Sequence, residues 1–455
     1  MFQRNVLAEL DKWRLSDKRK PLVIRGARQV GKTTLVHRFA ERFEQYIYLN
    51  LELSADRKPF EQFTTVDQFL EAVFFLKNRS YRNRKNTLLF IDEIQELPEA
   101  MNMLRYLYEE APDLPVIAAG SLLETIFNQK LHFPVGRVDY LVVRPAGFSE
   151  FLEALGEVQA LEQWNKLPLA DFAVERLFQL FHQYAIIGGM PAIVQQYADH
   201  RDLTSLKNLY ESLIAGYLDD VEKYAGSQSH VQHIRHAIRA SYAEAGKRIK
   251  FHGFGKSVYG SREMGEALRT LEKAMLLHLV YPNTSAVLPL LPDTRKSPRL
   301  QVLDTGLLNY SLGIQKEIIG TADLQDVYGG TMIEHLVGQE MLSTMYGALS
   351  GLHFWTRDKA GSSAELDWLY PWEGKLIPVE VKSGATGKLR SLHVFMEDAP
   401  HRMAVRFYAG GIQINEAKTM SGKTYFLLNL PYFLAAKLEN YLPWFNDQVS
   451  GITNA

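Results

Sequence analysis

A short glycine-rich segment near the start of the sequence carries residue types that bind phosphate. It reads Gly-Ala-Arg-Gln-Val-Gly-Lys-Thr-Thr and fits the spacing G-x-x-x-x-G-K-[ST]. Glycines let backbone N–H groups close around phosphate oxygens at a helix N-terminus, where the helix dipole favours anions. At this spacing the Lys32 ammonium can reach the β- and γ-phosphates of a nucleotide, and the Thr33 hydroxyl can ligate Mg²⁺. The predicted binding residues are Gly26, Ala27, Arg28, Gln29, Val30, Gly31, Lys32, Thr33 and Thr34.

Two carboxylates follow an apolar run about 60 residues after Lys32. Residues 87–91 read Thr-Leu-Leu-Phe-Ile, as a buried strand does, and Asp92 and Glu93 come directly after them. Asp92 has the position of a Walker B acid, which holds Mg²⁺ through water. Glu93 could polarise the attacking water as a general base, and this favours hydrolysis over nucleotide storage.

Ser121 and Arg137 are two further candidates for catalytic roles. Ser121 ends the strand pattern of residues 115–121, and it could lie between the γ-phosphate and the Walker B strand. A serine at a strand end is also a common helix N-cap. Arg137 could act as an arginine finger across a subunit interface, or it could pair with a surface acid.

The C-terminal part carries a second set of acidic and basic residues at strand spacing. Because side chains alternate along a strand, Glu380 and Lys382 share one face. Asp367 on a neighbouring strand could complete a divalent-metal site with Glu380, Glu334 could approach from a helix, and Glu365 shares the face of Asp367. Such a metal can activate water for phosphodiester cleavage, with Lys382 orienting the nucleophile. An acid and a lysine two residues apart are also common on exposed strands, so an inactive binding platform is the alternative.

A basic stretch in the middle of the chain is a candidate nucleic-acid contact. Residues 247–256 contain Lys247, Arg248, Lys250 and Lys256 interleaved with aromatic side chains, which could grip phosphates and stack on bases. A solvated basic loop anchored by its aromatic residues is the competing interpretation. A second basic run, residues 77–85, is better explained as a solvated face.

The elements that must position these residues alternate between strands and helices. An apolar strand, residues 21–25, leads into the glycine loop, and helical apolar spacing follows over residues 35–43. Residues 148–224 and 230–282 have helical patterns, including a helix that begins near Ser261. Strand patterns return from residue 298 onward. The predicted fold class is therefore α/β, with a helical middle region.

Length and composition limit the classes of protein to which the chain can belong. The 455 residues call for several domains, and 46% hydrophobic with 23% charged residues is typical of globular proteins. A formal net charge of −1 argues against nucleic-acid binding by bulk charge, although a local basic groove is compatible with it. The absence of cysteine excludes disulfides, thiolate metal sites and Cys nucleophiles. We find no signal peptide and no apolar run of ~18 residues, and we expect a cytoplasmic protein without membrane contact.

The motifs together resemble the AAA+ ATPases, and more narrowly the bacterial and archaeal proteins that couple an AAA_14-type domain to a DUF4143 domain. The resemblance covers nearly the whole chain. It rests on the glycine loop and on the segments 92–95 (Asp-Glu-Ile-Gln), 120–121 (Gly-Ser), 136–137 (Gly-Arg), 148–151 (Phe-Ser-Glu-Phe), 188–191 (Gly-Gly-Met-Pro) and 304–307 (Asp-Thr-Gly-Leu).

This resemblance implies a domain order and an assembly. We expect a P-loop ATPase core over residues 1–147, a helical lid over 148–228, a winged-helix-like module over 229–285, and a DUF4143 domain with a PD-(D/E)xK nuclease-like fold over 286–455. The family's usual pattern over the stretch 247–256 is small and polar, so the resemblance does not support the basic residues found there. AAA+ proteins often form homo-oligomeric rings of six subunits.

The predicted function is Mg²⁺-dependent ATP binding and hydrolysis, coupled to nucleic acid, with DNA favoured, through the middle region and the C-terminal domain. A second divalent metal would belong to the C-terminal domain if it cleaves phosphodiesters. The alternative is a nucleotide-controlled switch that acts on a protein partner and has an inactive nuclease-like scaffold.

Overall fold

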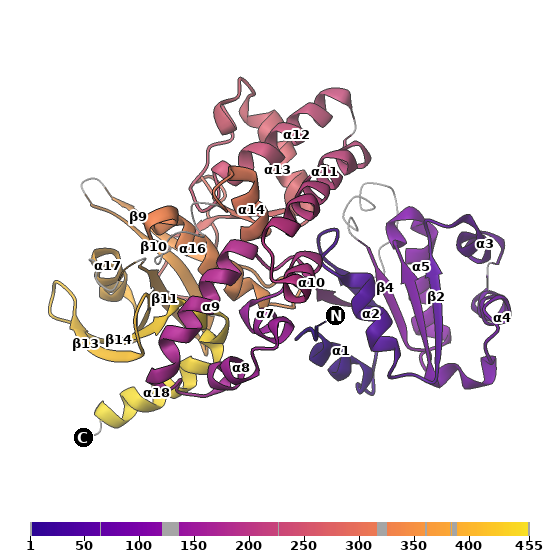
Figure 1. Cartoon of the computed structure of the whole chain (residues 1–455), viewed down its shortest axis with the longest axis horizontal. Coiled ribbons are helices and arrows are strands. Elements are labelled where there is room, and N and C mark those ends of the chain that lie inside the picture. Colours follow the sequence, from indigo (N-terminus) through magenta and orange to yellow (C-terminus); the bar gives the residue numbers. More distant parts are fainter. Residues whose placement is uncertain are drawn as a thin grey trace.

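A computed structural model shows three regions joined through the middle of the chain (Figure 1). It describes residues 2–63, 65–120, 136–225, 227–315, 325–359, 362–382, 384 and 389–453. An N-terminal α/β unit lies at one end, a C-terminal α/β unit at the other, and helices α7 to α14 lie between them. The predicted α/β fold class is confirmed.

The N-terminal unit is built on a parallel five-stranded sheet with the strand order β2-β3-β4-β1-β5. The strands are β1 (Leu22–Arg25), β2 (Gln45–Asn50), β3 (Thr87–Asp92), β4 (Val116–Ala119) and β5 (Asp139–Val142). Because every strand runs in the same direction, their carboxyl ends lie at one edge of the sheet. This edge receives the loop after β1 and the carboxylates at the end of β3.

Alternation along β3 divides the N-terminal core between two faces of the sheet. Leu88 and Phe90 pack with α1 (Leu7–Arg14) and α2 (Lys32–Ala40). Leu89 and Ile91 pack on the other side with α3 (Ser54–Gln62), α4 (Val66–Leu76) and α5 (Pro98–Glu110). A strand that is covered on both faces must be apolar throughout, as the uninterrupted run in residues 88–91 is.

Five helices follow the sheet and contact both ends of the molecule. They are α7 (Phe148–Leu155), α8 (Val158–Asn165), α9 (Val174–Ile187), α10 (Pro191–His200) and α11 (Lys207–Tyr224). The Phe178 ring lies 4.8 Å from the Phe433 ring of the C-terminal region, and Trp164 Nε1 donates to the Phe433 carbonyl at 3.1 Å. These helices therefore pack against the C-terminal unit as well as the N-terminal one.

The connector that comes next contains two helices and a small sheet. Helix α12 (Gln228–Ala243) and α13 (Ser261–Lys273) are joined through a 3₁₀ turn at Phe254–Lys256, and β6 (Leu277–Val280) follows. Strand β8 (Arg299–Val302) lies beyond the expected boundary at residue 285, yet it pairs with β6 in antiparallel fashion. Helix α14 (Thr305–Leu312) then packs on α9, α11 and α12.

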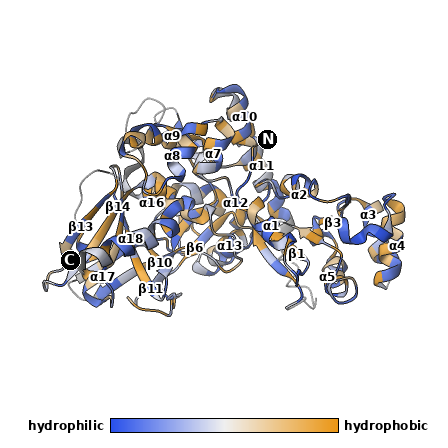
Figure 2. Cartoon of the chain, turned by 90° about the horizontal axis from the view of Figure 1, so that it is seen from below, coloured by the Kyte–Doolittle hydropathy of each residue, from blue (hydrophilic) through white to orange (hydrophobic). Residues whose placement is uncertain are grey.

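The C-terminal unit is a mixed seven-stranded sheet with the order β13-β14-β12-β11-β10-β9-β7. Its strands are β7 (Pro282–Asn283), β9 (His353–Lys359), β10 (Ser362–Trp372), β11 (Lys375–Val381), β12 (Met403–Tyr408), β13 (Gln413–Lys418) and β14 (Thr424–Pro431), and its helices are α16 (Gln325–Ser343), α17 (Arg390–Asp398) and α18 (Leu438–Thr453). Strand β7 comes from the connector and pairs with β9, so the connector and the C-terminal unit share one sheet. Figure 2 shows the strands mainly in hydrophobic colours and the helices in mixed colours, as expected for helices with one buried face.

Candidate active site

The glycine-rich loop joins β1 to α2 and has the backbone that its sequence predicts. Gly31 caps α2 with a φ of 90°, in the left-handed region that glycine adopts without strain. At Gly26, a side chain would collide with the carbonyl oxygen of Val143. Gly31 is therefore required by its backbone conformation and Gly26 by the close packing of the loop, which leads into the start of α2, where anions are favoured.

Lys32 is held inside this loop. Its ammonium donates to the carbonyl oxygens of Gly26 at 3.0 Å and Ala27 at 2.9 Å, and the residue is only 7% exposed. Burial lowers the pKa of Lys32 to about 8, against the opposing pull of the Glu93 and Asp92 carboxylates. The loop carbonyls thus hold the Lys32 ammonium at the start of α2, where phosphate oxygens would bind.

The Thr33 hydroxyl and the Asp92 carboxylate lie together, as a Mg²⁺ site requires. Thr33 Oγ1 donates to Asp92 Oδ2 at 2.8 Å, and the Tyr48 hydroxyl approaches the same oxygen at 3.3 Å. Burial is the main cause that raises the pKa of Asp92. These two oxygen ligands fit a hard divalent cation, which the protein would bind with a nucleotide.

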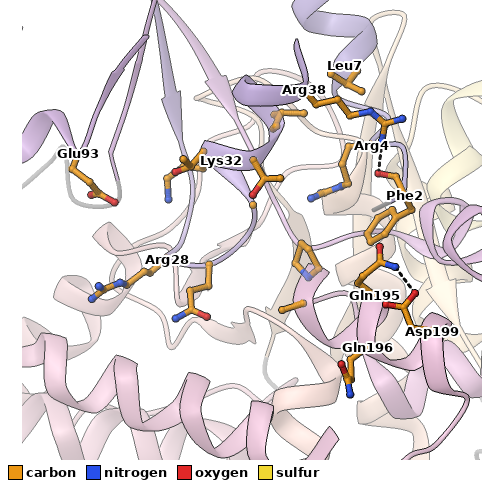
Figure 3. A pocket seen from close by; sticks show the side chains of 17 residues that line it. Phe2, Arg4, Leu7, Arg28, Lys32, Arg38, Glu93, Gln195, Gln196 and Asp199 are labelled. Carbon is orange, nitrogen blue, oxygen red and sulfur yellow. Dashed lines mark hydrogen bonds between the residues drawn. The ribbon is translucent and has the colours of Figure 1, made fainter. Parts of the chain in front are cut away.

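Glu93 directs its carboxylate toward the cavity beside the loop (Figure 3). Its backbone is in the left-handed region with a φ of 52°, which is uncommon for a residue other than glycine. Gln95 Nε2 donates to Glu93 Oε2 at 2.5 Å and orients the carboxylate. The sequence segment that contains Gln95 was recognised as part of a motif, but this orienting contact was not.

The cavity has a volume of about 590 Å³, which is the size of a pocket for a small ligand. Four parts of the chain line it: the glycine loop with α2, the N-terminal segment, helix α10, and Glu93 after β3 (Figure 3). Phe2, Leu7 and Pro191 contribute apolar surface, and Gln195 and Gln196 contribute amides. The predicted loop residues that line it are Arg28, Gln29, Gly31, Lys32, Thr33 and Thr34.

Arg4 is a site residue that sequence reasoning missed. Its guanidinium donates to the carbonyl oxygens of Val30 in the loop at 3.1 Å and Arg144 at 2.7 Å, and it pairs with Glu150 at 3.0 Å. Arg4 therefore fastens the N-terminal segment to the phosphate-binding loop. An isolated arginine outside any motif has no sequence signal that predicts such a contact.

Ser121 and Arg137 are the remaining predicted catalytic residues, and Arg137 does not line this cavity. Ser121 lies outside the described residues. Arg137 is on the surface, where its guanidinium pairs with Glu109 of α5 at 3.2 Å. This pair matches the surface-acid alternative within one chain, and a role for Arg137 across a subunit interface stays a prediction.

The structure brings the four C-terminal candidates together. Trp368 on β10 pairs with Val379 on β11, which places Asp367 beside Glu380 at the next position. The Val381 N–H donates to Asp367 Oδ2 at 2.7 Å, and Lys382 forms an ion pair with Glu380. Burial, followed by the neighbouring Asp367 carboxylate, raises the pKa of Glu380 to about 8 and that of Glu334 to about 7.

Arg299 lies among these carboxylates, and the sequence analysis did not single it out. Its guanidinium is 2.6 Å from Glu365 Oε1, 3.6 Å from Glu334 Oε2 and 3.9 Å from Asp367 Oδ1. Within the described residues, no group of three or more His, Asp or Glu side chains is arranged to hold a metal ion. The expected second divalent-metal site does not fit this arrangement, because a protein cation already neutralises the cluster.

The four predicted nucleic-acid contacts are exposed, and two of them have acidic partners. Lys247 lies 3.7 Å from Glu244, and Arg248 lies 3.3 Å from Glu365. Lys250 and Lys256 have no ion-pair partner among the described residues. In the second basic run, Lys77 pairs with Asp56 at 2.7 Å and Arg84 pairs with Asp113 at 2.9 Å.

Three family models match the chain. An AAA domain (AAA_14) matches residues 18–152, and two domains of unknown function, DUF8612 and DUF4143, match residues 178–318 and 329–433. A search of curated proteins gives no match. None of the described helices has both the length and the apolar character needed to cross a membrane.

Several solved structures are similar at low identity. A Walker-type ATPase of Pyrococcus abyssi is 15% identical, with a TM-score of 0.44 over 69% of this chain and 96% of that one. DnaA of Aquifex aeolicus bound to AMPPCP is 15% identical, with a TM-score of 0.24 over 59% and 87% of the two chains. The Orc1 protein of Aeropyrum pernix in complex with DNA is 12% identical, with a TM-score of 0.23 over 70% and 94%.

The parallel sheet, the glycine loop and the Thr33–Asp92 pair define a P-loop ATPase of the AAA+ class. More narrowly, the chain carries an AAA_14 domain followed by a C-terminal DUF4143 domain, as its motifs predicted. ATP and Mg²⁺ use follows from membership of this class.

Proposed function

We propose that this ATPase couples Mg²⁺-dependent ATP hydrolysis to nucleic acid, most favourably DNA, through the connector and the DUF4143 domain. The observation that carries this proposal is the arrangement of the connector. Two helices, α12 and α13, meet at a turn that presents the exposed Lys256, and the antiparallel pair β6–β8 follows. That order is the one found in winged-helix modules, whose second helix enters a DNA groove.

In the proposed hydrolysis step, four side chains have separate tasks. Lys32 exchanges its loop carbonyls for the γ-phosphate, and Thr33 and Asp92 hold Mg²⁺, which would neutralise charge that develops on the phosphates. Glu93 accepts a proton as water attacks the γ-phosphorus, the bond to the β–γ bridging oxygen breaks, and ADP and phosphate leave. Gln95 keeps the Glu93 carboxylate oriented during this step.

The proposed coupling runs from the loop through α11 to the connector. Arg28 in the loop pairs with Asp220 of α11, and the Tyr217 hydroxyl of the same helix donates to the Arg28 carbonyl at 3.1 Å. Helix α11 packs on α12 and α14 of the connector. ATP would compete with Asp220 for Arg28. Nucleotide binding would therefore weaken the contact between the loop and α11 and shift the equilibrium position of the connector.

The proposed nucleic-acid surface combines the basic stretch with the outer face of α13. Lys250 and Lys256 are exposed, and Arg262 is exposed on the first turn of α13. Met264, Leu268 and Leu271 bury the opposite face of that helix. Because phosphate contacts dominate nucleic-acid affinity, this surface should bind in a strongly salt-dependent manner.

The proposal includes assembly into a homo-oligomeric ring, with six subunits as the expected number. In such a ring, Arg137 would leave Glu109 and reach the nucleotide of a neighbouring subunit. Size-exclusion chromatography with light scattering, with and without ATP, tests the assembly directly.

Steady-state ATP hydrolysis with Mg²⁺ tests the main proposal, in the presence of single-stranded, duplex or branched nucleic acid. Lys32→Ala serves as the blank. We expect at least one of these nucleic acids to stimulate turnover, and the double variant Lys250→Ala/Lys256→Ala to lose that stimulation while keeping basal turnover. The matched control, Lys166→Ala/Lys418→Ala, removes two exposed lysines elsewhere and should behave like the parent.

A second candidate function is a nucleotide-controlled switch that acts on a protein partner. The observation that favours it is the Arg299 guanidinium within the nuclease-like carboxylates, which suits a scaffold better than a nuclease. Slow turnover that is indifferent to every nucleic acid would support the switch and count against nucleic-acid coupling.

A further inference from the structure

The acidic cluster of the DUF4143 domain is centred on an arginine that comes from the connector. Arg299 lies on β8 and is 3% exposed. Besides its three carboxylate neighbours, its Nη1 donates to the main-chain carbonyl of Asp367 at 2.9 Å. The guanidinium lies 4.8 Å from the Phe354 ring centroid and 5.2 Å from that of Trp368, so two aromatic rings enclose it. These groups form a pocket that matches a planar guanidinium cation.

The positions of the charges leave no role for a metal ion beside Arg299. The Asp367 carboxylate accepts a hydrogen bond from the Val381 N–H and lies 3.9 Å from Arg299 Nη2, and Glu380 is paired with Lys382. A divalent ion that used Asp367 and Glu334 would lie within a few ångströms of the guanidinium, at a separation where like charges repel strongly in a buried setting. Arg299 and Lys382 therefore supply the positive charge that the carboxylates need.

A second connector arginine reaches the same cluster. Arg248 Nη1 lies 3.3 Å from Glu365 Oε2, and Arg299 Nη2 lies 2.6 Å from Glu365 Oε1. The Glu365 carboxylate of the DUF4143 domain thus bridges the guanidinium groups of two connector arginines. Arg248 and Arg299 are also opposite each other in an antiparallel bridge.

Main-chain hydrogen bonds join β8 to the start of the basic stretch. The N–H groups of Gly246 and Ile249 donate to the carbonyls of Leu300 and Pro298 at 2.7 and 2.8 Å, and the Leu300 N–H donates to Lys247 at 2.9 Å. Residues 246–249 therefore run alongside β8 as a third strand would. The contacts that hold Arg299 in the cluster therefore also position residues 246–249, which directly precede Lys250.

We propose that the nuclease-like carboxylates of this chain are an arginine-binding site. Glu334, Glu365 and Asp367 bind Arg299 in place of a metal ion, Glu365 also binds Arg248, and these contacts dock the connector's basic segment on the DUF4143 domain. This inference does not depend on the proposed coupling to nucleic acid, because it concerns only contacts within the chain.

Binding of Mn²⁺ to the full chain without nucleotide tests the exclusion of metal, with free Mn²⁺ followed by electron paramagnetic resonance. Whatever Mn²⁺ the parent binds should be unaffected by Asp367→Asn. Arg299→Met should gain a site with a dissociation constant below ~1 mM, and adding Asp367→Asn to it should remove that site. Mn²⁺ bound by the parent that Asp367→Asn abolishes would overturn the proposal, as would a folded Arg299→Met variant that gains no site.

Hydrogen exchange of the backbone amides of residues 246–250 tests the docking role and does not require the Arg299→Met variant to fold. Glu365→Gln, which weakens both arginine contacts, should speed exchange there by about tenfold. Glu416→Gln removes an exposed carboxylate from β13 of the same sheet and is the matched control. Equal exchange in the two variants would refute the docking of the basic segment by the cluster.

Discussion

Arg28 of the phosphate-binding loop forms an ion pair with Asp220 of α11, 192 residues further along the chain. The Asp220 side chain is 8% exposed, and the Arg28 side chain, which also lines the nucleotide cavity, is 42% exposed. A buried acid therefore holds an arginine that faces the site where phosphates would bind. In the proposed coupling, a bound nucleotide would compete with α11 for this cation.

Asp220→Asn should tighten ATP binding. Without the carboxylate, Arg28 loses one partner that competes with the phosphates, and a nearby negative charge is removed. For a partly exposed pair this is an effect of ~2- to 5-fold in the dissociation constant. Titration of a fluorescent ATP analogue measures it. Asp219→Asn, at the exposed neighbouring position, is the control. Equal or weaker affinity relative to that control would show that Asp220 does not compete for Arg28.

Glu93→Gln should retain ATP binding and lower turnover by ~10²- to 10⁴-fold, because the amide cannot accept the proton of the attacking water. Phosphate release under saturating ATP measures the rate, and filter binding measures ATP retention. Glu99→Gln, on the exposed face of α5, should turn over like the parent. An unchanged rate in Glu93→Gln would remove this residue from the role of base.

Glu340→Gln should change how stability depends on pH. Glu340 is fully buried and accepts two contacts from the Phe148 N–H, at 3.0 and 3.2 Å. Burial raises its pKa from 4.5 to about 8, so the native state holds a proton that the unfolded state releases. The associated stability is fully present below about pH 4.5 and is lost as the pH rises through about 8.

Urea unfolding between pH 5 and 9 checks this linkage. The difference in free energy of unfolding between the parent and Glu340→Gln should shift in favour of the variant as the pH rises. The comparison with the variant is needed because burial raises the pKa of Asp304, to about 6, in the same direction. A difference that does not vary with pH would contradict the buried, protonated Glu340.

Gly189→Ala should destabilise the protein by ~1–3 kcal/mol, because a methyl group there would overlap the Ala146 carbonyl oxygen. Gly189 also donates its N–H to Asp304 at 2.5 Å and accepts from the Ala146 N–H at 2.7 Å. Gly216→Ala is the control, since its methyl group would meet open space on a helix and should stabilise by about 0.5–1 kcal/mol. Urea unfolding of both variants gives the comparison. A Gly189→Ala variant as stable as the parent would show that the chain can relax at this contact.

The Gly189 contact also explains two segments by which the family was recognised. Residues 188–191 and 304–307 are far apart in sequence, yet Asp304 accepts from the Gly189 N–H and caps α14 through the Leu307 N–H at 3.0 Å. In the sequence, each segment is a short local motif. Their meeting in a buried junction explains why glycines and an aspartate stand at those positions.

Local patterns in the sequence were enough to predict the phosphate-binding loop, the strand that ends at Asp92, the helix from Ser261 and the α/β class. Each depends on residues within about one element of each other, where spacing and backbone preference act directly. Only the tertiary structure decided three contacts of lone arginines. Arg4 donates to the glycine loop, Arg28 pairs with Asp220, and Arg299 lies among the C-terminal carboxylates. The physical reason is that an ion pair is selected by distance in space, and a lone arginine carries no periodicity to show which distant carboxylate it will meet.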